Sequence, residues 1–131
     1  MDPQRLLCRL AELAHGGCRE FRLGAGDRPL RGFVVRTGQG TNLAVHAYIN
    51  LCRHMPFRMN YLPDDLLTYD GRFIECKMHG ARYEKDTGLC VHGPCLGRSL
   101  ISLPVRVQEG CVLLADGPDI AELAMRYAAY A

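Results

Sequence analysis

The sequence predicts an all-β fold with a short helix at each end, and three observations lead to this prediction. Apolar and polar side chains alternate over residues 42–51, as they do in a strand with one buried face. Asp70-Gly71 and Glu109-Gly110 each separate two short apolar runs, and Asp-Gly between such runs is a strong hairpin signal. Only residues 3–14 and the tail after Asp116 show helical spacing.

Length and composition limit the possible functions. A chain of 131 residues is expected to form one domain, residues 1–131, with a single core. A net charge of +2 is too small to indicate a nucleic acid or a membrane surface as partner. No apolar run approaches the length of a membrane span, and no signal peptide is evident. Seven cysteines, an odd number, argue against a closed disulfide framework, so we expect a cytoplasmic protein with reduced thiols.

The first third of the chain predicts one helix and two strands. Leucines recur at helical spacing over residues 3–14, between Pro3 and Gly16-Gly17. Strands are expected at 20–23 and 33–36, with a turn at 37–40. Cys8 and Cys18 have no histidine at ligand spacing and are expected to be buried thiols.

The strand over residues 42–51 should bury one face and leave the other in solvent. Its apolar face carries Leu43, Val45, Ala47, Ile49 and Leu51, and its polar face carries Asn42, Ala44, His46, Tyr48 and Asn50. Hairpins are predicted over 66–75, 82–92 and 103–114, the last including Cys111 as a structural residue. A helix should begin near Gly117-Pro118-Asp119, with Ile120, Leu123, Ala124 and Tyr127 on its packed side.

Two short ligand pairs stand at the ends of predicted strands. Cys52-Arg53-His54 follows the strand 42–51, and Cys76-Lys77-Met78-His79 follows the second strand of the hairpin 66–75. Two facing loops of this kind would present two sulfur and two imidazole ligands. Such a set suits a [2Fe–2S] cluster in which two His replace two Cys on one iron. It also suits a structural Cys2His2 zinc module that serves protein interaction.

The residues around the second pair resemble the Rieske family. Cys76-x-x-His79-Gly80 is followed by Tyr83, by an acidic residue with Thr87-Gly88, and by Gly93-Pro94, in the order of the Rieske motif. The resemblance covers about a third of the chain. It departs from the family at Pro56, where many members have Gly. Phe57 and Met78 occupy the positions of the disulfide that joins the two loops in respiratory members, so the sequence resembles the soluble, disulfide-free branch.

The resemblance implies a Rieske iron–sulfur fold of small antiparallel sheets with a cluster-binding subdomain at about residues 50–97. Cys52 and Cys76 would hold the inner iron of one [2Fe–2S] cluster, and His54 and His79 the outer iron. Gly80, Tyr83, Gly93 and Pro94 would surround the cluster. High-potential relatives have Ser and Tyr donating to cluster sulfur; here the Ser position is Ala81 and the Tyr position is kept as Tyr83, which implies an intermediate potential.

The function implied is that of a small ferredoxin without catalytic activity of its own. It would pass one electron from a flavin reductase to an oxygenase-type enzyme, and both partners would dock near His54 and His79. The alternatives are the zinc module and a redox-sensing subunit with the same cluster. The spacing of Cys90 and Cys95 permits a disulfide, but in a reducing compartment we expect both to pack as thiols beneath the Gly93-Pro94 loop.

Overall fold

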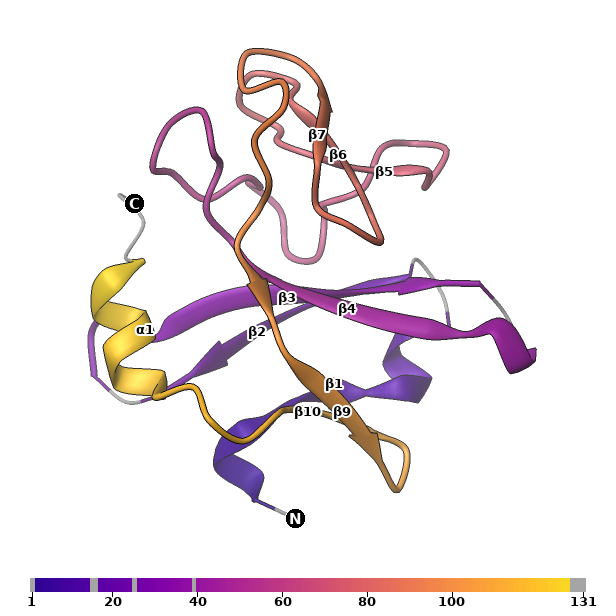
Figure 1. Ribbon diagram of the computed structural model, residues 1–131, viewed down its shortest axis with the longest axis vertical. Helices are drawn as coiled ribbons and strands as arrows, with labels where there is room; N and C mark the ends of the chain where they lie inside the picture. Colours follow the sequence, from indigo (N-terminus) through magenta and orange to yellow (C-terminus); the bar gives the residue numbers. More distant parts are fainter. Residues whose placement is uncertain (1, 15–16, 25, 39, 128–131) are drawn as a thin grey trace.

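Three small antiparallel sheets make up most of the fold (Figure 1). The computed structural model describes residues 2–14, 17–24, 26–38 and 40–127. The first sheet has the order β1-β10-β9, the second β2-β3-β4-β8 and the third β5-β6-β7. The strands are β1 (Leu6–Arg9), β2 (Cys18–Leu23), β3 (Leu30–Thr37), β4 (Ala44–Ile49), β5 (Phe73–Glu75), β6 (Arg82–Glu84), β7 (Cys90–His92), β8 (Ser102–Leu103), β9 (Val105–Gln108) and β10 (Cys111–Leu114). The predicted all-β fold is confirmed.

The predicted N-terminal helix over residues 3–14 is wrong. Strand β1 occupies the middle of this segment, between the 3₁₀ turns η1 (Pro3–Arg5) and η2 (Leu10–Leu13). β1 pairs antiparallel with β10, with Leu6 opposite Leu113 and Arg9 opposite Cys111. Pairing with β10 satisfies the backbone of this segment and overrides its helical leucine spacing, which is a weak signal beside tertiary contacts.

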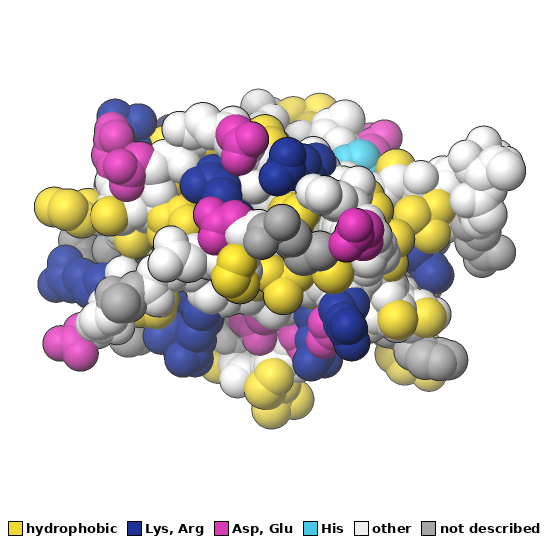
Figure 2. Space-filling model, turned by 90° about the horizontal axis from the view of Figure 1, so that it is seen from below, with side chains coloured by type: hydrophobic (Ala, Val, Ile, Leu, Met, Phe, Trp, Pro, Cys, Tyr) yellow, Lys and Arg dark blue, Asp and Glu magenta, His cyan; other side chains and the backbone are white. Residues whose placement is uncertain are grey.

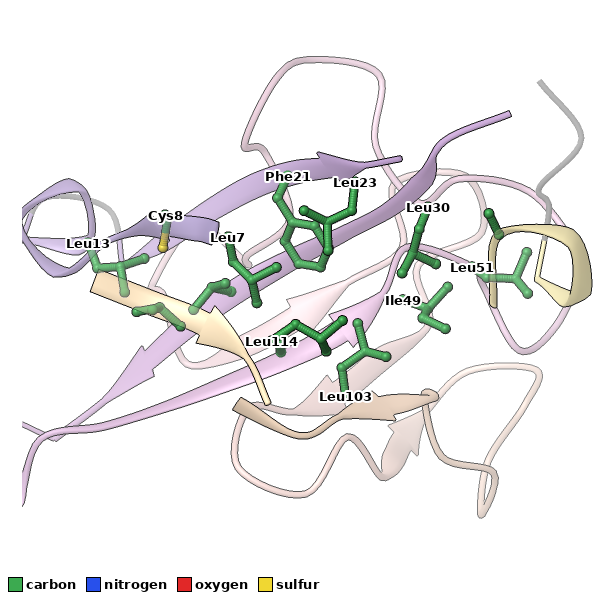
Figure 3. Packing of buried hydrophobic residues seen from close by; sticks show 14 residues of the cluster. Leu7, Cys8, Leu13, Phe21, Leu23, Leu30, Ile49, Leu51, Leu103 and Leu114 are labelled. Atoms are coloured by element: carbon green, nitrogen blue, oxygen red, sulfur yellow. The ribbon is translucent and has the colours of Figure 1, made fainter. Parts of the chain in front are cut away.

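The second sheet lies between two hydrophobic cores, and its strands β3 and β4 contribute side chains to both. One core lies between this sheet, the β1-β10-β9 sheet and the C-terminal helix, and Figure 3 shows its leucines meeting Phe21 and Ile49. The other core lies under the β5-β6-β7 sheet and includes Phe33, Tyr48 and Tyr83. Alternate residues of β3 and β4 therefore point into different cores.

The second core corrects the predicted solvent face of the strand 42–51. Ile49 packs in the first core as expected, but Tyr48 and Asn50 are almost fully buried on the opposite face. Tyr48 stacks at a tilt on Phe33, with 5.8 Å between ring centroids, and its hydroxyl donates to the Lys85 carbonyl at 2.8 Å. The strand itself is β4, and its partly covered His46 contacts Thr37 Oγ1 through Nε2 at 3.0 Å.

The predicted hairpins are present with one modification. β6 and β7 form the hairpin 82–92, and β9 and β10 turn at Glu109-Gly110. In the hairpin 66–75 only the second arm is a regular strand, β5. The first arm is joined to it by a bridge from Leu67 to Ile74 and by the Thr68 amide donating to the Phe73 carbonyl at 2.8 Å.

The chain ends its described part in α1 (Ile120–Arg126), which begins where the sequence predicts. Asp119 caps it, because its carboxylate accepts the Glu122 amide at 3.1 Å. Ala124 is buried in the first core, and Ile120, Leu123 and Tyr127 pack against that core. The Ala-rich end after Tyr127 lies outside the described residues.

Figure 2 shows the face opposite the β5-β6-β7 layer, where Lys and Arg side chains alternate with Asp and Glu among apolar groups. No single sign of charge dominates this face. Of the helices in the described part of the chain, none is long and apolar enough to cross a membrane.

Candidate metal centre

The two predicted ligand pairs lie on two loops of similar construction. In the first loop the Cys52 amide donates to the Phe57 carbonyl at 3.0 Å. In the second the Cys76 amide donates to the Ala81 carbonyl at 2.8 Å. Each bond closes a short loop directly behind its cysteine, so the histidine two or three residues later is held near the loop tip.

Backbone contacts hold these loops next to each other and next to a third loop. The Lys77 amide donates to the Met59 carbonyl at 2.7 Å, which joins the second loop to the end of the first. Arg98, after the Gly93-Pro94 loop, donates from Nη1 to the Arg53 carbonyl at 3.2 Å. All three loops lie at the end of the molecule that is uppermost in Figure 1.

The four predicted ligands come together as one buried pair and one exposed pair. Cys52 and Cys76 are 4% and 0% exposed, whereas His54 and His79 are exposed. The imidazole rings meet edge to face, with 5.0 Å between their centroids. The centre therefore has a sulfur end inside the protein and a nitrogen end at the surface.

The surroundings of the two sulfurs favour one negative charge, on Cys52. A hydrogen bond from Cys76 lowers the pKa of the Cys52 thiol well below its usual value, and the same bond raises the pKa of Cys76. Backbone amides of His54 and Met55 also donate to the Cys52 sulfur, and those of Met78 and His79 to the Cys76 sulfur. Amides directed at sulfur stabilise the anionic form that metals bind.

A two-iron cluster fits this arrangement better than a single ion does. The sulfurs pair with each other and the imidazoles pair with each other, as two metals with different ligands require. Among the residues that the structure describes, no three His, Cys, Asp or Glu side chains converge on one metal position. Among the described residues, one buried side-chain nitrogen or oxygen lacks a hydrogen-bond partner, and it is Nε of Arg53. An anionic group is the kind of partner that this guanidinium lacks.

Tyr83 lies beneath the first loop and contacts two sulfurs. It is fully buried, and its hydroxyl is 3.6 Å from Cys52 Sγ and 3.1 Å from Cys95 Sγ. The hydroxyl oxygen accepts the Arg53 amide at 3.2 Å. Burial and these sulfur contacts raise the pKa of Tyr83, so it remains a neutral donor. The hydroxyl thus contacts the sulfur of Cys52, one of the predicted ligands, but the nearer sulfur belongs to Cys95.

Two of the predicted glycines have backbone angles that favour glycine. Gly80 has φ +76° directly after His79, and Gly93 has φ +106° next to the exposed Pro94. A Cβ on Gly93 would lie 2.8 Å from the Ala81 Cα, closer than real Cβ atoms approach other atoms. The third loop therefore packs directly on the second one, and only glycine fits there.

The sequence did not predict the hydrogen bonds that support the first loop. Asn50 Oδ1 accepts the Met59 amide at 2.9 Å, and Asn50 Nδ2 donates to Asn60 Oδ1 at 2.8 Å. Glu20, from β2, accepts Asn60 Nδ2 at 2.9 Å and the Asp64 amide at 2.8 Å. Asn50 lies two residues before Cys52, and this position next to a proposed ligand is the sequence feature that could have indicated its role.

The remaining cysteines carry no ligand role in this geometry. Cys8, Cys18 and Cys111 are buried free thiols, as predicted. Burial raises the pKa of Cys8 and of Cys18 to about 12. Cys90 and Cys95 are also free, with their sulfurs 3.3 Å apart beneath the Gly93-Pro94 loop.

Comparisons with known proteins agree with this geometry. The family described as Rieske [2Fe-2S] domain matches residues 5–111. No curated protein matches the chain significantly.

Three solved structures are similar over most of this chain. A chain in the complex of reduced oxygenase and oxidised ferredoxin of carbazole 1,9a-dioxygenase is 26% identical with a TM-score of 0.60, over 84% of this chain and 99% of its own. The ferredoxin of carbazole 1,9a-dioxygenase from Nocardioides aromaticivorans IC177 is 25% identical with a TM-score of 0.61, over 85% of this chain and 94% of its own. A Sphingomonas yanoikuyae B1 ferredoxin, 23% identical with a TM-score of 0.61, covers 86% of this chain and 97% of its own, and shows the same fold.

Proposed function

The chain belongs to the Rieske [2Fe-2S] domain family, and we propose that it is an electron-transfer protein that carries one electron on one [2Fe–2S] cluster. We assign Cys52 and Cys76 to one iron and His54 and His79 to the other. Residues 1–131 would form one domain, with residues 50–97 as the cluster-binding subdomain.

One observation carries this proposal: the thiols are buried and the imidazoles are exposed at the same site. In such a cluster the imidazole-bound iron accepts the electron, because imidazole donates less charge than thiolate does. With the exposed His54 and His79 as its ligands, the electron-accepting iron would lie at the surface. The amides that donate to both sulfurs stabilise the added negative charge after reduction.

The surface around the two histidines suits a transient protein partner. Exposed apolar side chains come from all three loops: Met55 is 42% exposed, Met78 36% and Leu96 68%. Arg98 is exposed beside them. We propose that this surface docks an oxygenase on one occasion and a flavin reductase on another. The ferredoxin–oxygenase complex of carbazole 1,9a-dioxygenase, whose matching chain is 26% identical, supports the first partner.

The same reasoning supports a carrier without its own catalytic site. Outside the proposed ligands, the described histidines are His46 and His92, which lie on different sheets. His46 is engaged with Thr37, and His92 is exposed on β7. We also propose a cytoplasmic location, which the seven free cysteines support because thiols stay reduced there.

Anaerobic reconstitution with iron and sulfide, followed by electron paramagnetic resonance of the reduced protein, tests this function. We expect two irons and two sulfides per chain and a spectrum with the low average g value typical of a His-ligated cluster. The reduced protein should then support substrate turnover by a carbazole 1,9a-dioxygenase oxygenase and its reductase. A colourless protein with one zinc per chain would show the Cys2His2 interaction module instead. A reduced cluster that binds the oxygenase stably without supporting turnover would show the sensing subunit.

A further inference from the structure

Three arginines line one pocket beside the first ligand loop. Arg22 comes from β2, Arg31 from β3 and Arg58 from the segment that follows His54. The pocket has a volume of about 230 Å³ and is open to solvent. Pockets for drug-sized molecules measure about 300–1,000 Å³, so this one suits a smaller ligand. The proposed electron-transfer function gives these arginines no role.

The pairing of β2 with β3 brings two of the positive charges together. Arg22 lies directly opposite Arg31 in the antiparallel register, so both side chains project from the same face of the sheet. Like charges at such positions repel each other and destabilise a sheet. Burial lowers the pKa of the Arg31 guanidinium, and the charges of Arg22 and Arg58 lower it further. The three guanidiniums therefore interact unfavourably around one hollow.

The residues around the pocket do not balance these charges. Glu20 is the acidic residue among those that line it, and its attraction for Arg31 is partial compensation. Both Glu20 oxygens are already engaged, because Oε1 accepts Asn60 Nδ2 at 2.9 Å and Oε2 accepts the Asp64 amide at 2.8 Å.

The three arginine side chains are left without partners in the described part of the chain, where none of them has a hydrogen bond or an ion pair. Three positive charges and one negative charge line the pocket, which leaves two positive charges uncompensated. Unpaired arginines are ordinary on an open surface. Here, however, three share one pocket, and Arg31 and Arg58 are partly buried in it.

We propose that this pocket binds a doubly charged oxyanion of the phosphate class, either free phosphate or the phosphoryl group of a small molecule. A guanidinium donates two parallel N–H bonds in a geometry that matches phosphate oxygens. A phosphoryl group carries about −1.5 to −2 charges at pH 7, which matches the uncompensated charge of the pocket. A single carboxylate of a protein partner would neutralise only half of it.

The bound anion would fasten the first ligand loop to the second sheet. Arg58 directly follows Phe57, whose carbonyl accepts the Cys52 amide at 3.0 Å and closes that loop. An anion shared by Arg31 and Arg58 joins β3 to the end of the loop. Binding to the folded chain alone should therefore raise its resistance to unfolding.

Calorimetric titration of the full chain with inorganic phosphate in low-salt buffer tests the site. We expect one phosphate per chain. Arg31→Gln and Arg58→Gln should each weaken binding about tenfold or more, because each removes charge-assisted hydrogen bonds. Arg36→Gln is the matched control and should bind like the wild-type protein, because Arg36 is also partly buried on β3 but lies outside the pocket.

A parallel titration with glycerol phosphate distinguishes the two sources of the anion. Tighter binding than that of inorganic phosphate would identify the phosphoryl group of a small molecule as the ligand. Equal or weaker binding would identify free phosphate.

Urea unfolding gives a second readout, one that a purely structural role of the arginines would not produce. Without phosphate, Arg31→Gln relieves the repulsion, so its unfolding midpoint should lie above that of the wild-type protein. With phosphate, the wild-type protein and Arg36→Gln should gain stability, and Arg31→Gln should not. A raised midpoint without phosphate also shows that Arg31→Gln is folded.

Two results would overturn the inference: no binding of phosphate at millimolar concentration, or undiminished binding by both Arg31→Gln and Arg58→Gln. If phosphate fails to bind while Arg58→Gln slows turnover with an oxygenase, the arginines serve an acidic protein partner and the inference is wrong. Calorimetry measures the anion whether or not a cluster is present, so a failure of the proposed function leaves this test intact.

Discussion

Replacement of Gly93 by alanine tests whether the third loop sets the position of the second ligand loop. Gly93 has φ +106°, and its new Cβ would lie 2.8 Å from the Ala81 Cα and 3.4 Å from the Ala81 amide nitrogen. The contacted atoms are mostly backbone, and Ala81 is fully buried two residues after His79. The clash therefore cannot be relieved by rotating a flexible side chain.

Two costs add up in the free energy of unfolding that Gly93→Ala loses. A non-glycine residue held at such a φ costs about 1–3 kcal/mol, and overpacking a tight contact adds about 1–3 kcal/mol. Gly97→Ala is the matched control, because Gly97 lies in the same loop with φ +88° and has open space at its Cβ position. Gly97→Ala should have only the cost of the backbone conformation. Gly93→Ala should thus lose about 2–6 kcal/mol of unfolding free energy, and Gly97→Ala about half of that.

Urea unfolding followed by far-ultraviolet circular dichroism measures this difference, and cluster absorbance after reconstitution measures its effect on the site. We expect Gly93→Ala to be less stable than Gly97→Ala and to retain less cluster. Equal losses in the two variants would refute the reasoning, because they would show that contact with Ala81 has no role.

Three further predictions follow from other parts of the molecule. Tyr48→Phe removes the hydroxyl that donates to the Lys85 carbonyl, so urea unfolding should show a loss of about 1 kcal/mol; an unchanged midpoint would contradict this. Burial raises the pKa of Cys8 and Cys18 to about 12 in the folded protein, so their contribution to stability is complete below about pH 9 and is lost as the pH rises towards 12. Each thiol should cost about 1 kcal/mol between pH 9 and pH 10, because the unfolded thiol is about half ionised at pH 9. Equal unfolding free energies at these two pH values would count against it. Leu96→Asp should slow reduction by a flavin reductase about tenfold, equivalent to about 1.4 kcal/mol. Val107 is an exposed apolar residue on β9, and Val107→Asp should leave this rate unchanged. Equal rates of reduction in the two variants would argue against docking at the histidines.

The sequence predicted the two loops that carry the proposed ligands because its signals are local. Cys-x-His and Cys-x-x-His each fix two ligands on one tight loop, and the strands before them are visible as β4 and β5. Asp119 and the turn at Glu109-Gly110 are local signals of the same kind, and both predictions are confirmed.

What the sequence did not predict depends on contacts between distant segments. Residues 6–9 have helical leucine spacing but form β1, because β10 lies beside them in the fold. Tyr48 and Asn50 alternate like solvent-facing residues, yet the β5-β6-β7 layer covers Tyr48, and the segment with Met59 and Asn60 covers Asn50. The sulfur nearest to the Tyr83 hydroxyl likewise belongs to Cys95, twelve residues later in the chain. Periodicity alone contains none of this information.

The central claim is that two buried thiolates and two exposed imidazoles share one [2Fe–2S] cluster, with the imidazoles on the same iron. Pulsed electron paramagnetic resonance of the reduced protein, prepared with ¹⁵N-labelled histidine, tests it most directly. We predict coupling of the electron spin to two histidine nitrogens, with one of the two lost in His54→Cys and in His79→Cys. A reduced cluster without histidine coupling, or a protein that binds only zinc, would contradict the assignment.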